Sequence, residues 1–124
     1  MLSTPANTLP KEERLCGKTT ISALISEGKW GSTAHLKYCW RPAREEGPGR
    51  IMVSVSKKFF KRAVRRNLLK RRLREAYRTQ KELLTVEGID FMLVWNGKEI
   101  AEYALIREEV ATILGRISKA AAQR

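Results

Sequence analysis

The residues of this chain that could do chemistry are mostly cations, and they gather between Lys57 and Arg74. This stretch holds ten Lys or Arg residues and no Asp or Glu. The whole chain carries a formal charge of +12 and has a pI near 10.2. Like charges at this density repel one another, so they need a polyanion that neutralises them or a fold that spreads them apart. The run therefore predicts a binding surface for nucleic acid.

Residues suited to acid–base or metal chemistry are scarce in the sequence. Hydrolysis of a phosphodiester needs a metal clamp or a positioned acid and base, yet the chain has one Asp, Asp90, and one His, His35. The carboxylate pairs Glu12-Glu13 and Glu45-Glu46 fall in a polar arm and a Pro/Gly loop, where nothing would hold them in ligand geometry. We therefore predict that the chain itself carries no catalytic residue and no metal site, and that His35 lies on the surface.

The cationic stretch must be positioned by a helix. Apolar residues recur three, four and seven positions apart, which places them on one helical face; they are Leu69, Leu73, Ala76, Tyr77 and Leu84. The opposite side then carries Lys70, Arg71, Arg74, Arg78 and Lys81. Such a helix could also be a solvated surface, lie on an anionic membrane or bind calmodulin. All charges in the run are positive, and the apolar stripe of the helix is narrow. Nucleic acid is therefore the favoured partner.

The remaining pattern predicts one α+β domain. The expected elements are a helix over 18–27, strands over 34–41, 51–56 and 89–95, the basic helix, and a last helix over 99–119. Alternation places Ile51, Val53 and Val55 toward the core, with Met52, Ser54 and Ser56 on the other face. We expect residues 1–13 to form a flexible arm, 14–119 to form the domain, and 120–124 to fray.

The chain offers no sign of export or of a membrane. Its first residues lack the apolar segment of a signal peptide, and no apolar run is long enough to cross a bilayer. Cys16 and Cys39 are too few for a disulfide framework or a zinc site, so we expect reduced thiols. These features predict a cytoplasmic protein.

The stretch from Ser54 to Tyr77 resembles the signature region of the bacterial ribonuclease P protein subunit. In that family a strand ending in Ser-x-Ser-Lys-Lys leads through a short loop to an Arg-Asn-Arg helix start, then to Lys-Arg, two apolar positions and Arg-Glu-Ala-aromatic. The matching residues here are Ser54, Ser56, Lys57, Lys58, Ala63, Val64, Arg66, Asn67, Lys70, Arg71, Leu73, Arg74, Glu75, Ala76 and Tyr77. Leu68 stands where Arg is usual, and Arg65, just upstream, offers a substitute charge.

The resemblance implies a fold like the second domain of a small-subunit ribosomal protein. That fold packs three helices on a sheet of three to four strands and has a left-handed β-α-β crossover around the basic helix, although crossovers in general are right-handed. The implied RNA-binding residues are Lys57, Lys58, Lys61, Arg62, Arg65, Arg66, Asn67, Lys70, Arg71 and Arg74.

The resemblance also implies the partners. They are the ribonuclease P RNA subunit and the 5′ leader of precursor tRNA, with Mg²⁺ ions at an active site in the RNA and no further protein required. Candidates for the leader cleft are Ile21, Ile25, Tyr38, Ser54 and Ser56. Ile21 and Ile25 could equally line the cleft or belong to the core. Tyr38 could be a platform on which a base stacks or an aromatic residue of the core.

Two functions remain open at this point. The chain is either the protein subunit of a ribonucleoprotein endonuclease that removes 5′ leaders from precursor tRNA, or a non-catalytic RNA-binding or ribosome-associated protein with the same fold.

Overall fold

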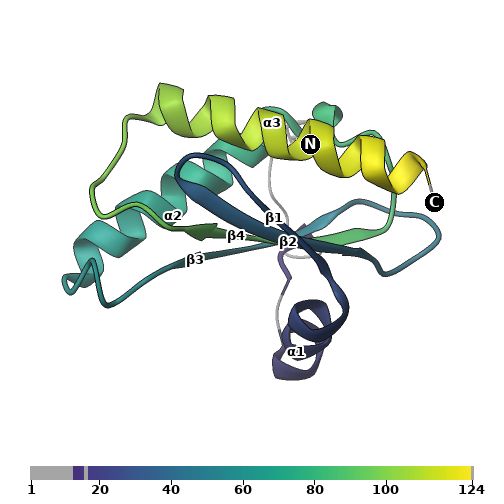
Figure 1. Ribbon diagram of the computed structural model, residues 1–124, viewed down its shortest axis with the longest axis horizontal. Helices are drawn as coiled ribbons and strands as arrows, with labels where there is room; N and C mark the ends of the chain where they lie inside the picture. Colours follow the sequence, from purple (N-terminus) through teal and green to yellow (C-terminus); the bar gives the residue numbers. More distant parts are fainter. Residues whose placement is uncertain (1–12, 16, 124) are drawn as a thin grey trace, which may run out of the picture.

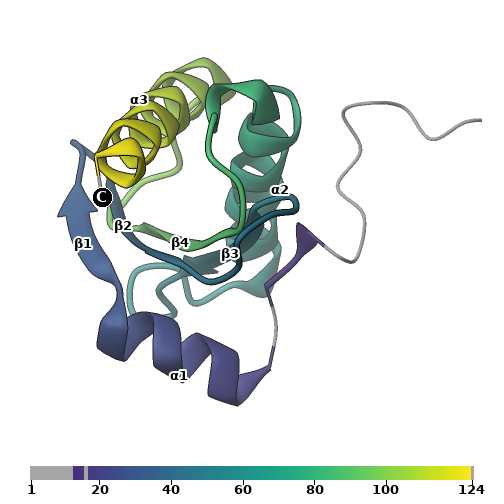
Figure 2. The same cartoon turned by 90° about the vertical axis from the view of Figure 1, so that its right-hand side faces the viewer.

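The computed structural model describes residues 13–15 and 17–123 as a four-stranded mixed sheet with helices on both faces. Helices α2 and α3 cover one face and α1 lies on the other (Figures 1 and 2). The elements are α1 (Lys18–Glu27), β1 (Lys29–Ser32), β2 (Leu36–Pro42), β3 (Arg50–Val55), α2 (Ala63–Arg78), the short 3-10 helix η2 (Lys81–Leu83), β4 (Ile89–Trp95) and α3 (Tyr103–Ala122). The predicted α+β class is confirmed.

The main core lies between the sheet and the two helices α2 and α3. Strand residues at every second position supply it, as the period of two predicts; they include Leu36, Tyr38, Trp40, Ile51, Val53, Val55, Phe91 and Leu93. The helices contribute Leu69 and Leu73 from α2 and Ile113 from α3, all fully buried. Burying a side chain of this size stabilises a fold by roughly 1.5–3 kcal/mol. This core therefore holds α2 in place despite the charge on its outer side.

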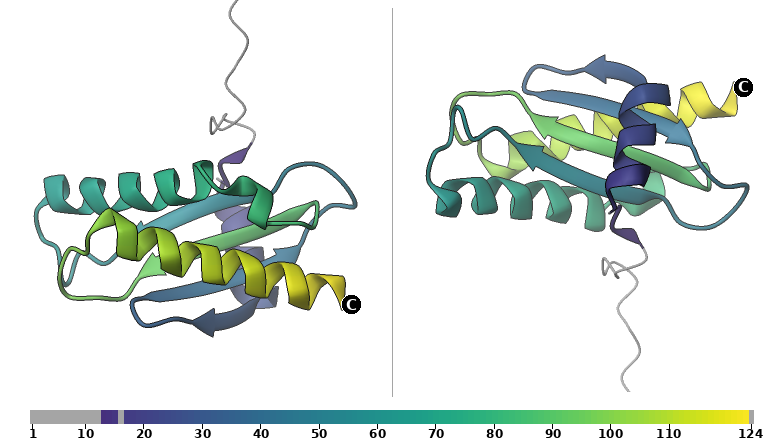
Figure 3. Two further views of the ribbon diagram at one scale, coloured as in Figure 1. Left: turned by 90° about the horizontal axis from the view of Figure 1, so that it is seen from above. Right: turned by 90° about the horizontal axis from the view of Figure 1, so that it is seen from below.

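Strands β3 and β4 run parallel and adjacent, paired from Arg50↔Asp90 to Val55↔Trp95. The chain passes between them through α2. Seen from the side of α2 and α3 with both strands pointing up, β4 lies to the left of β3 (Figure 3). The crossover is therefore left-handed, against the general rule for parallel strands and as the resemblance implied.

A smaller cluster lies on the opposite face, beneath α1. It joins Leu24 of α1 to Cys39 and Met92 of the sheet, with Leu15 at its side. The Cys39 thiol donates a hydrogen bond to the Leu24 carbonyl oxygen at 3.3 Å, and burial raises its pKa, so this thiol stays protonated. Cys16 lies outside the described residues. Because α1 crosses the sheet as one short helix (Figure 3), it leaves part of this face open.

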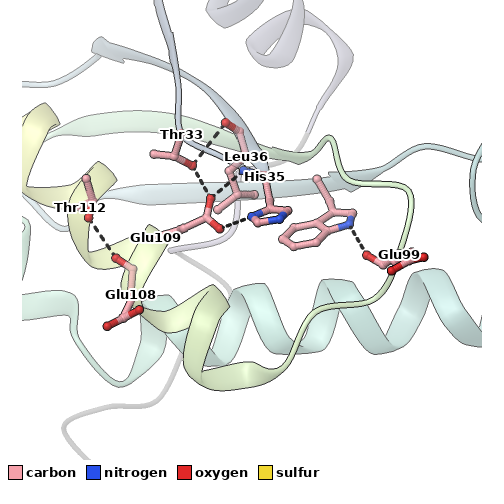
Figure 4. A network of polar contacts seen from close by, with 8 residues as sticks. Thr33, His35, Leu36, Glu99, Glu108, Glu109 and Thr112 are labelled. Carbon is pink, nitrogen blue, oxygen red and sulfur yellow. Dashed lines mark hydrogen bonds and ion pairs between the residues drawn. The ribbon is translucent and has the colours of Figure 1, made fainter.

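A polar network fixes α3 to the turn between β1 and β2 (Figure 4). The Glu109 carboxylate accepts hydrogen bonds from the Thr33 hydroxyl at 2.6 Å and from the His35 backbone N–H at 2.9 Å. The His35 Nδ1 atom lies 2.7 Å from the other carboxylate oxygen. Burial is the largest single influence on the pKa of Glu109 and raises it, but the hydrogen bonds together outweigh burial and hold the pKa below its usual value.

The prediction that His35 lies on the surface holds, since its side chain is 40% exposed, but its ring also stacks on Trp95 with the centroids 5.5 Å apart. Two other features differ from the predictions. Strand β1 was not expected and forms by pairing with β2. The tail does not fray from residue 120, because α3 continues to Ala122 and buries Ala121. Of the predicted arm, residues 1–12 lie outside the described part, while Glu13 is buried and paired with Lys81 at 2.9 Å.

Candidate nucleic-acid interface

The cationic stretch forms the loop after β3 and the outward side of α2. Leu69, Leu73, Ala76 and Tyr77 are buried, as predicted, and none of the ten candidate RNA-binding residues is buried. Arg66 and Lys70 are half-buried, and the other eight are exposed. The helical period separates the two sets because residues three and four apart share one side. The loop and helix α2 together present one continuous basic face, which we call the α2 surface.

The α2 surface has little internal charge compensation. Arg78 pairs with Glu75 at 2.7 Å, and Arg72 donates to the Ala101 carbonyl oxygen at 2.6 Å. Among the described residues, no carboxylate forms a salt bridge with Lys57, Lys58, Lys61, Arg62, Arg65, Lys70, Arg71 or Arg74. These eight side chains can therefore form ion pairs with the phosphates of a partner.

Arg66 has a structural role that the sequence did not reveal. Helix α2 begins at Ala63, so the backbone N–H of Arg66 is already bonded to the Arg62 carbonyl oxygen. The Arg66 guanidinium donates to the carbonyl oxygens of Phe60 at 2.6 Å and Lys61 at 2.9 Å. It thereby ties the loop to the helix. The resemblance places Arg66 and Asn67 at the helix start, but in the structure α2 begins one turn earlier, at Ala63.

The tied loop shapes a shallow pocket at the start of α2. Phe60 is buried and anchors the loop, while Phe59 is exposed. The pocket is lined by Lys58, Phe59, Phe60, Lys61, Arg62 and Arg65. Four cations around one depression, with an aromatic ring at its side, suit a phosphate and its neighbouring base.

Arg14 extends the α2 surface, although its single charge gave no strong signal in the sequence. An isolated bridge to Ile51 places Arg14 at the outer edge of β3. Partial burial, and then the positive charge of Arg14, lower the pKa of Arg74. Two cations held close enough to affect each other are stabilised when an anion lies between them. Asn67 is exposed beside this surface and Leu68 is half-buried at its rim.

The open part of the sheet lies on the α1 side. On this face the pairing register aligns Ser32, Lys37, Val94 and Ser54 across the four strands. Together with Ile21 and Ile25 they form what we call the α1-side surface. The Glu27 carboxylate reaches Arg41 at 2.6 Å, near the other end of the strands. Since Ile21 and Ile25 lie on the flank of α1 opposite Glu27, they face Lys37, Val94 and Ser54.

The five leader-cleft candidates do not all meet there. Ile21 is half-buried, Ile25 is 46% exposed, and Ser54 is half-buried on the same surface. Ser56 follows the end of β3, where its Oγ accepts a hydrogen bond from the Lys58 backbone N–H at 3.1 Å. Tyr38 is 7% exposed and points into the main core on the opposite face, so its ring cannot take part.

An aromatic residue that the sequence reading missed does lie on the α1 side. Trp30 in β1 pairs with Cys39, whose side chain points toward α1, so Trp30 points the same way. Its side chain is 45% exposed. The Lys37 Nζ atom lies 5.0 Å from the Trp30 ring centroid. Strand β1 has only four residues, one of them Gly31, so the sequence shows no strand pattern here and does not indicate the side to which Trp30 points.

The described residues hold no cluster of three or more His, Cys, Asp or Glu side chains placed to bind a metal ion. Asp90, fully buried, accepts two hydrogen bonds from the Arg50 guanidinium at 2.8 and 2.7 Å. In the same part of the chain no helix is long and apolar enough to cross a membrane.

Comparisons with known proteins agree with this geometry. The family model described as Ribonuclease P matches residues 9–118. A ribonuclease P protein component from Porphyromonas gingivalis is 42% identical over 95% of this chain and 92% of its own length. A solved structure of the RNase P protein from Thermotoga maritima is 28% identical, with a TM-score of 0.75 over 85% of this chain and 97% of that one.

A second solved structure, the RNase P protein from Staphylococcus aureus, supports the fold alone at 22% identity, with a TM-score of 0.73. The family match covers the α2 surface, the sheet, α1, α2 and most of α3, and it favours the first of the two functions left open by the sequence. The chain belongs to the ribonuclease P protein family, whose members are protein subunits of the tRNA-processing ribonucleoprotein endonuclease.

Proposed function

We propose that this subunit uses two surfaces for two RNAs. The α2 surface binds the ribonuclease P RNA, and the α1-side surface binds the single-stranded 5′ leader of precursor tRNA. The observation that carries the proposal is the set of eight cations on the α2 surface without a described carboxylate partner. Strand β3 joins the two surfaces, because Ser54 points to the α1 side and the basic loop follows Val55.

The physical role of the α2 surface is to neutralise phosphates where two polyanions meet. Each phosphate that a Lys or Arg neutralises releases condensed counterions, and this release supplies much of the binding free energy at moderate salt. A folded RNA and a precursor tRNA repel each other strongly, so a protein with a net charge of +12 reduces the cost of bringing them together.

The α1-side surface suits a flexible single strand better than a duplex. Its floor has a serine at each end with Lys37 and Val94 between them, and its wall is formed by Ile21 and Ile25. Apolar side chains contact bases that are not paired, while Lys37 and the loop cations contact the phosphates between them. Binding of the leader would hold the precursor against the RNA subunit and distinguish it from mature tRNA.

We place the chemistry of cleavage in the RNA subunit, with Mg²⁺ ions held there. Among the described residues no three His, Cys, Asp or Glu side chains lie close enough together to hold a metal ion. Asp90 is engaged by Arg50, and Glu109 by Thr33 and His35. We therefore assign no step of the reaction to an ion bound by this chain.

Reconstitution with a bacterial ribonuclease P RNA at low Mg²⁺ tests the proposal. We expect the protein to promote cleavage of a precursor tRNA, and the holoenzyme to bind that precursor more tightly than the same tRNA without its leader. At saturating subunit, Glu45→Gln, Glu46→Gln, His35→Ala and Asp90→Asn should keep the single-turnover rate, although Asp90→Asn should lower stability because it weakens a buried ion pair.

Equal affinity for precursor and leaderless tRNA would refute the role of the α1-side surface. Loss of single-turnover cleavage in one of the four variants, with folding and assembly intact, would show that the protein carries catalytic groups.

A further inference from the structure

Three tryptophans occupy different environments in this fold. Trp40 and Trp95 are 4% and 1% exposed and belong to the main core, whereas Trp30 is 45% exposed on the α1 side. A large aromatic ring on an edge strand of a small sheet gains little from packing when it stays half in water. The exposed ring of Trp30 is therefore available to a ligand.

The backbone around Trp30 is held firmly, although its side chain is exposed. A Cβ atom at Gly31 would lie 2.5 Å from the Tyr38 ring, so only glycine lets β1 pack closely on that side. A Cβ atom at Gly28 would lie 2.3 Å from the Cys39 sulfur, so α1 and β1 are joined by one tightly packed residue. These two contacts fix the position of Trp30 relative to α1, and hence relative to the α1-side surface.

Lys37 supplies a cation to the same place. Its Nζ atom lies 5.0 Å from the Trp30 ring centroid, its side chain is exposed, and no described carboxylate forms a salt bridge with it. A nucleotide has a flat base and a phosphate, and an exposed ring beside an uncompensated cation matches both. The pair formed by Lys29 and Trp40, at 5.5 Å, differs because the Trp40 ring is buried.

We propose that Trp30 and Lys37 form a base-stacking subsite for single-stranded RNA at the β1 edge of the α1-side surface. The ring of Trp30 takes the face of an unpaired base, and Lys37 takes an adjacent phosphate. This inference rests on the proposed role of that surface in leader binding. It supplies the aromatic stacking that the aliphatic side chains of Ile21 and Ile25 cannot give. Because Trp30 lies on the edge strand β1, the subsite extends the surface that contacts the RNA strand beyond α1.

Two substitutions at one position separate stacking from packing. In the reconstituted holoenzyme, Trp30→Leu should raise the dissociation constant of a leader-bearing precursor tRNA by about fivefold or more, because stacking of one base on an aromatic side chain contributes on the order of 1–3 kcal/mol. Trp30→Phe keeps a ring and should retain most of the affinity. Neither variant should change binding of leaderless tRNA or of the RNA subunit.

The outcomes distinguish this inference from the proposed function. If the wild-type holoenzyme prefers leader-bearing tRNA and Trp30→Leu keeps that preference, the stacking subsite is refuted while leader binding stands. If the wild type shows no preference, leader binding itself fails and the subsite fails with it. An equal loss in Trp30→Phe and Trp30→Leu would also contradict stacking.

A second measurement needs no substitution. Acrylamide quenching of tryptophan fluorescence in the unmodified protein should report mainly Trp30, since the other two rings are buried. Saturation with a single-stranded RNA octamer should reduce this quenching. Unchanged quenching at saturation would overturn the inference. So would protection that appears without RNA as the protein concentration rises, because a second copy of the chain would then cover Trp30.

Discussion

Neutralising two cations of the α2 surface should change the salt dependence of binding to the ribonuclease P RNA by a calculable amount. We choose Arg65→Gln and Arg71→Gln, because both side chains are exposed and form no salt bridge with a described carboxylate. Each duplex-like phosphate contact contributes about −0.9 to the slope of log K against log salt. Five contacts on the α2 surface would give the wild type a slope of about −4.5, and the double variant should lose about 1.8 of it.

The same arithmetic gives the loss of affinity. At 0.15 M monovalent salt, a slope change of about 1.8 corresponds to roughly 30-fold weaker binding. The assay is a fluorescence polarisation titration of labelled RNA subunit over a series of salt concentrations at constant Mg²⁺. Circular dichroism should show that the variant folds as the wild type does, because neither side chain is buried.

A matched control separates a local contact from net charge. Arg107→Gln with Lys119→Gln removes two exposed cations from α3 and changes the charge of the protein equally. We expect this control to keep the wild-type slope within about 0.5, because screening confines the effect of a distant surface charge to about 10 Å. An equal loss of slope in both double variants would refute the assignment of the RNA contact to α2.

Two further predictions concern single residues. Leu68→Arg replaces a half-buried residue at the rim of α2; it should cost less than about 1 kcal/mol of stability and tighten RNA binding a few-fold, and unfolding in a thermal melt would show that Leu68 belongs to the core. Glu109→Gln should lower the free energy of unfolding at pH 7 by about 1–2 kcal/mol in urea titrations, because three hydrogen bonds to the carboxylate weaken. Since the folded pKa of Glu109 is lowered, its stabilisation is present above its unfolded pKa of about 4.3 and is lost as the pH falls through the lower folded value. The deficit of Glu109→Gln should therefore shrink in acid, and a deficit that persists unchanged below that range would contradict the network.

Local periodicity predicted the elements that carry a strong one-sided pattern. The apolar run Ile89–Trp95 forms the strand β4 at the inside of the sheet, and α2 buries Leu69 and Leu73 as its spacing required. Ile51 and Ser54 also lie on the predicted opposite faces of β3. In each case a single segment contains the whole signal, so no knowledge of its neighbours was needed.

Features that depend on pairing between distant segments could not be predicted from the sequence. A period of two shows that Leu36, Tyr38 and Trp40 share a face, but it does not show which helices cover that face. Tyr38 could therefore be taken for a platform on the open side, although it lies in the main core. His35 and Glu109 are 74 residues apart, and nothing in either segment indicates the other. Trp30 was missed for the same reason, because β1 exists only through its pairing with β2.

The unequal division of the core between the two faces of the sheet explains how this small domain keeps so much surface for RNA. Helix α2 has no acidic residue in its first turn and no side-chain cap at its start, although both would stabilise an ordinary helix. Acidic residues there would compete with phosphate for the same cations. The helix is held by the main core and by the Arg66 contacts to the loop. Because that core lies on one face, the α1 face needs only the small cluster around Leu24, and the rest of it stays open. The domain therefore places most of its core on one face of the sheet, and under the proposed function the open part of the other face and the outer side of α2 are the surfaces that bind RNA.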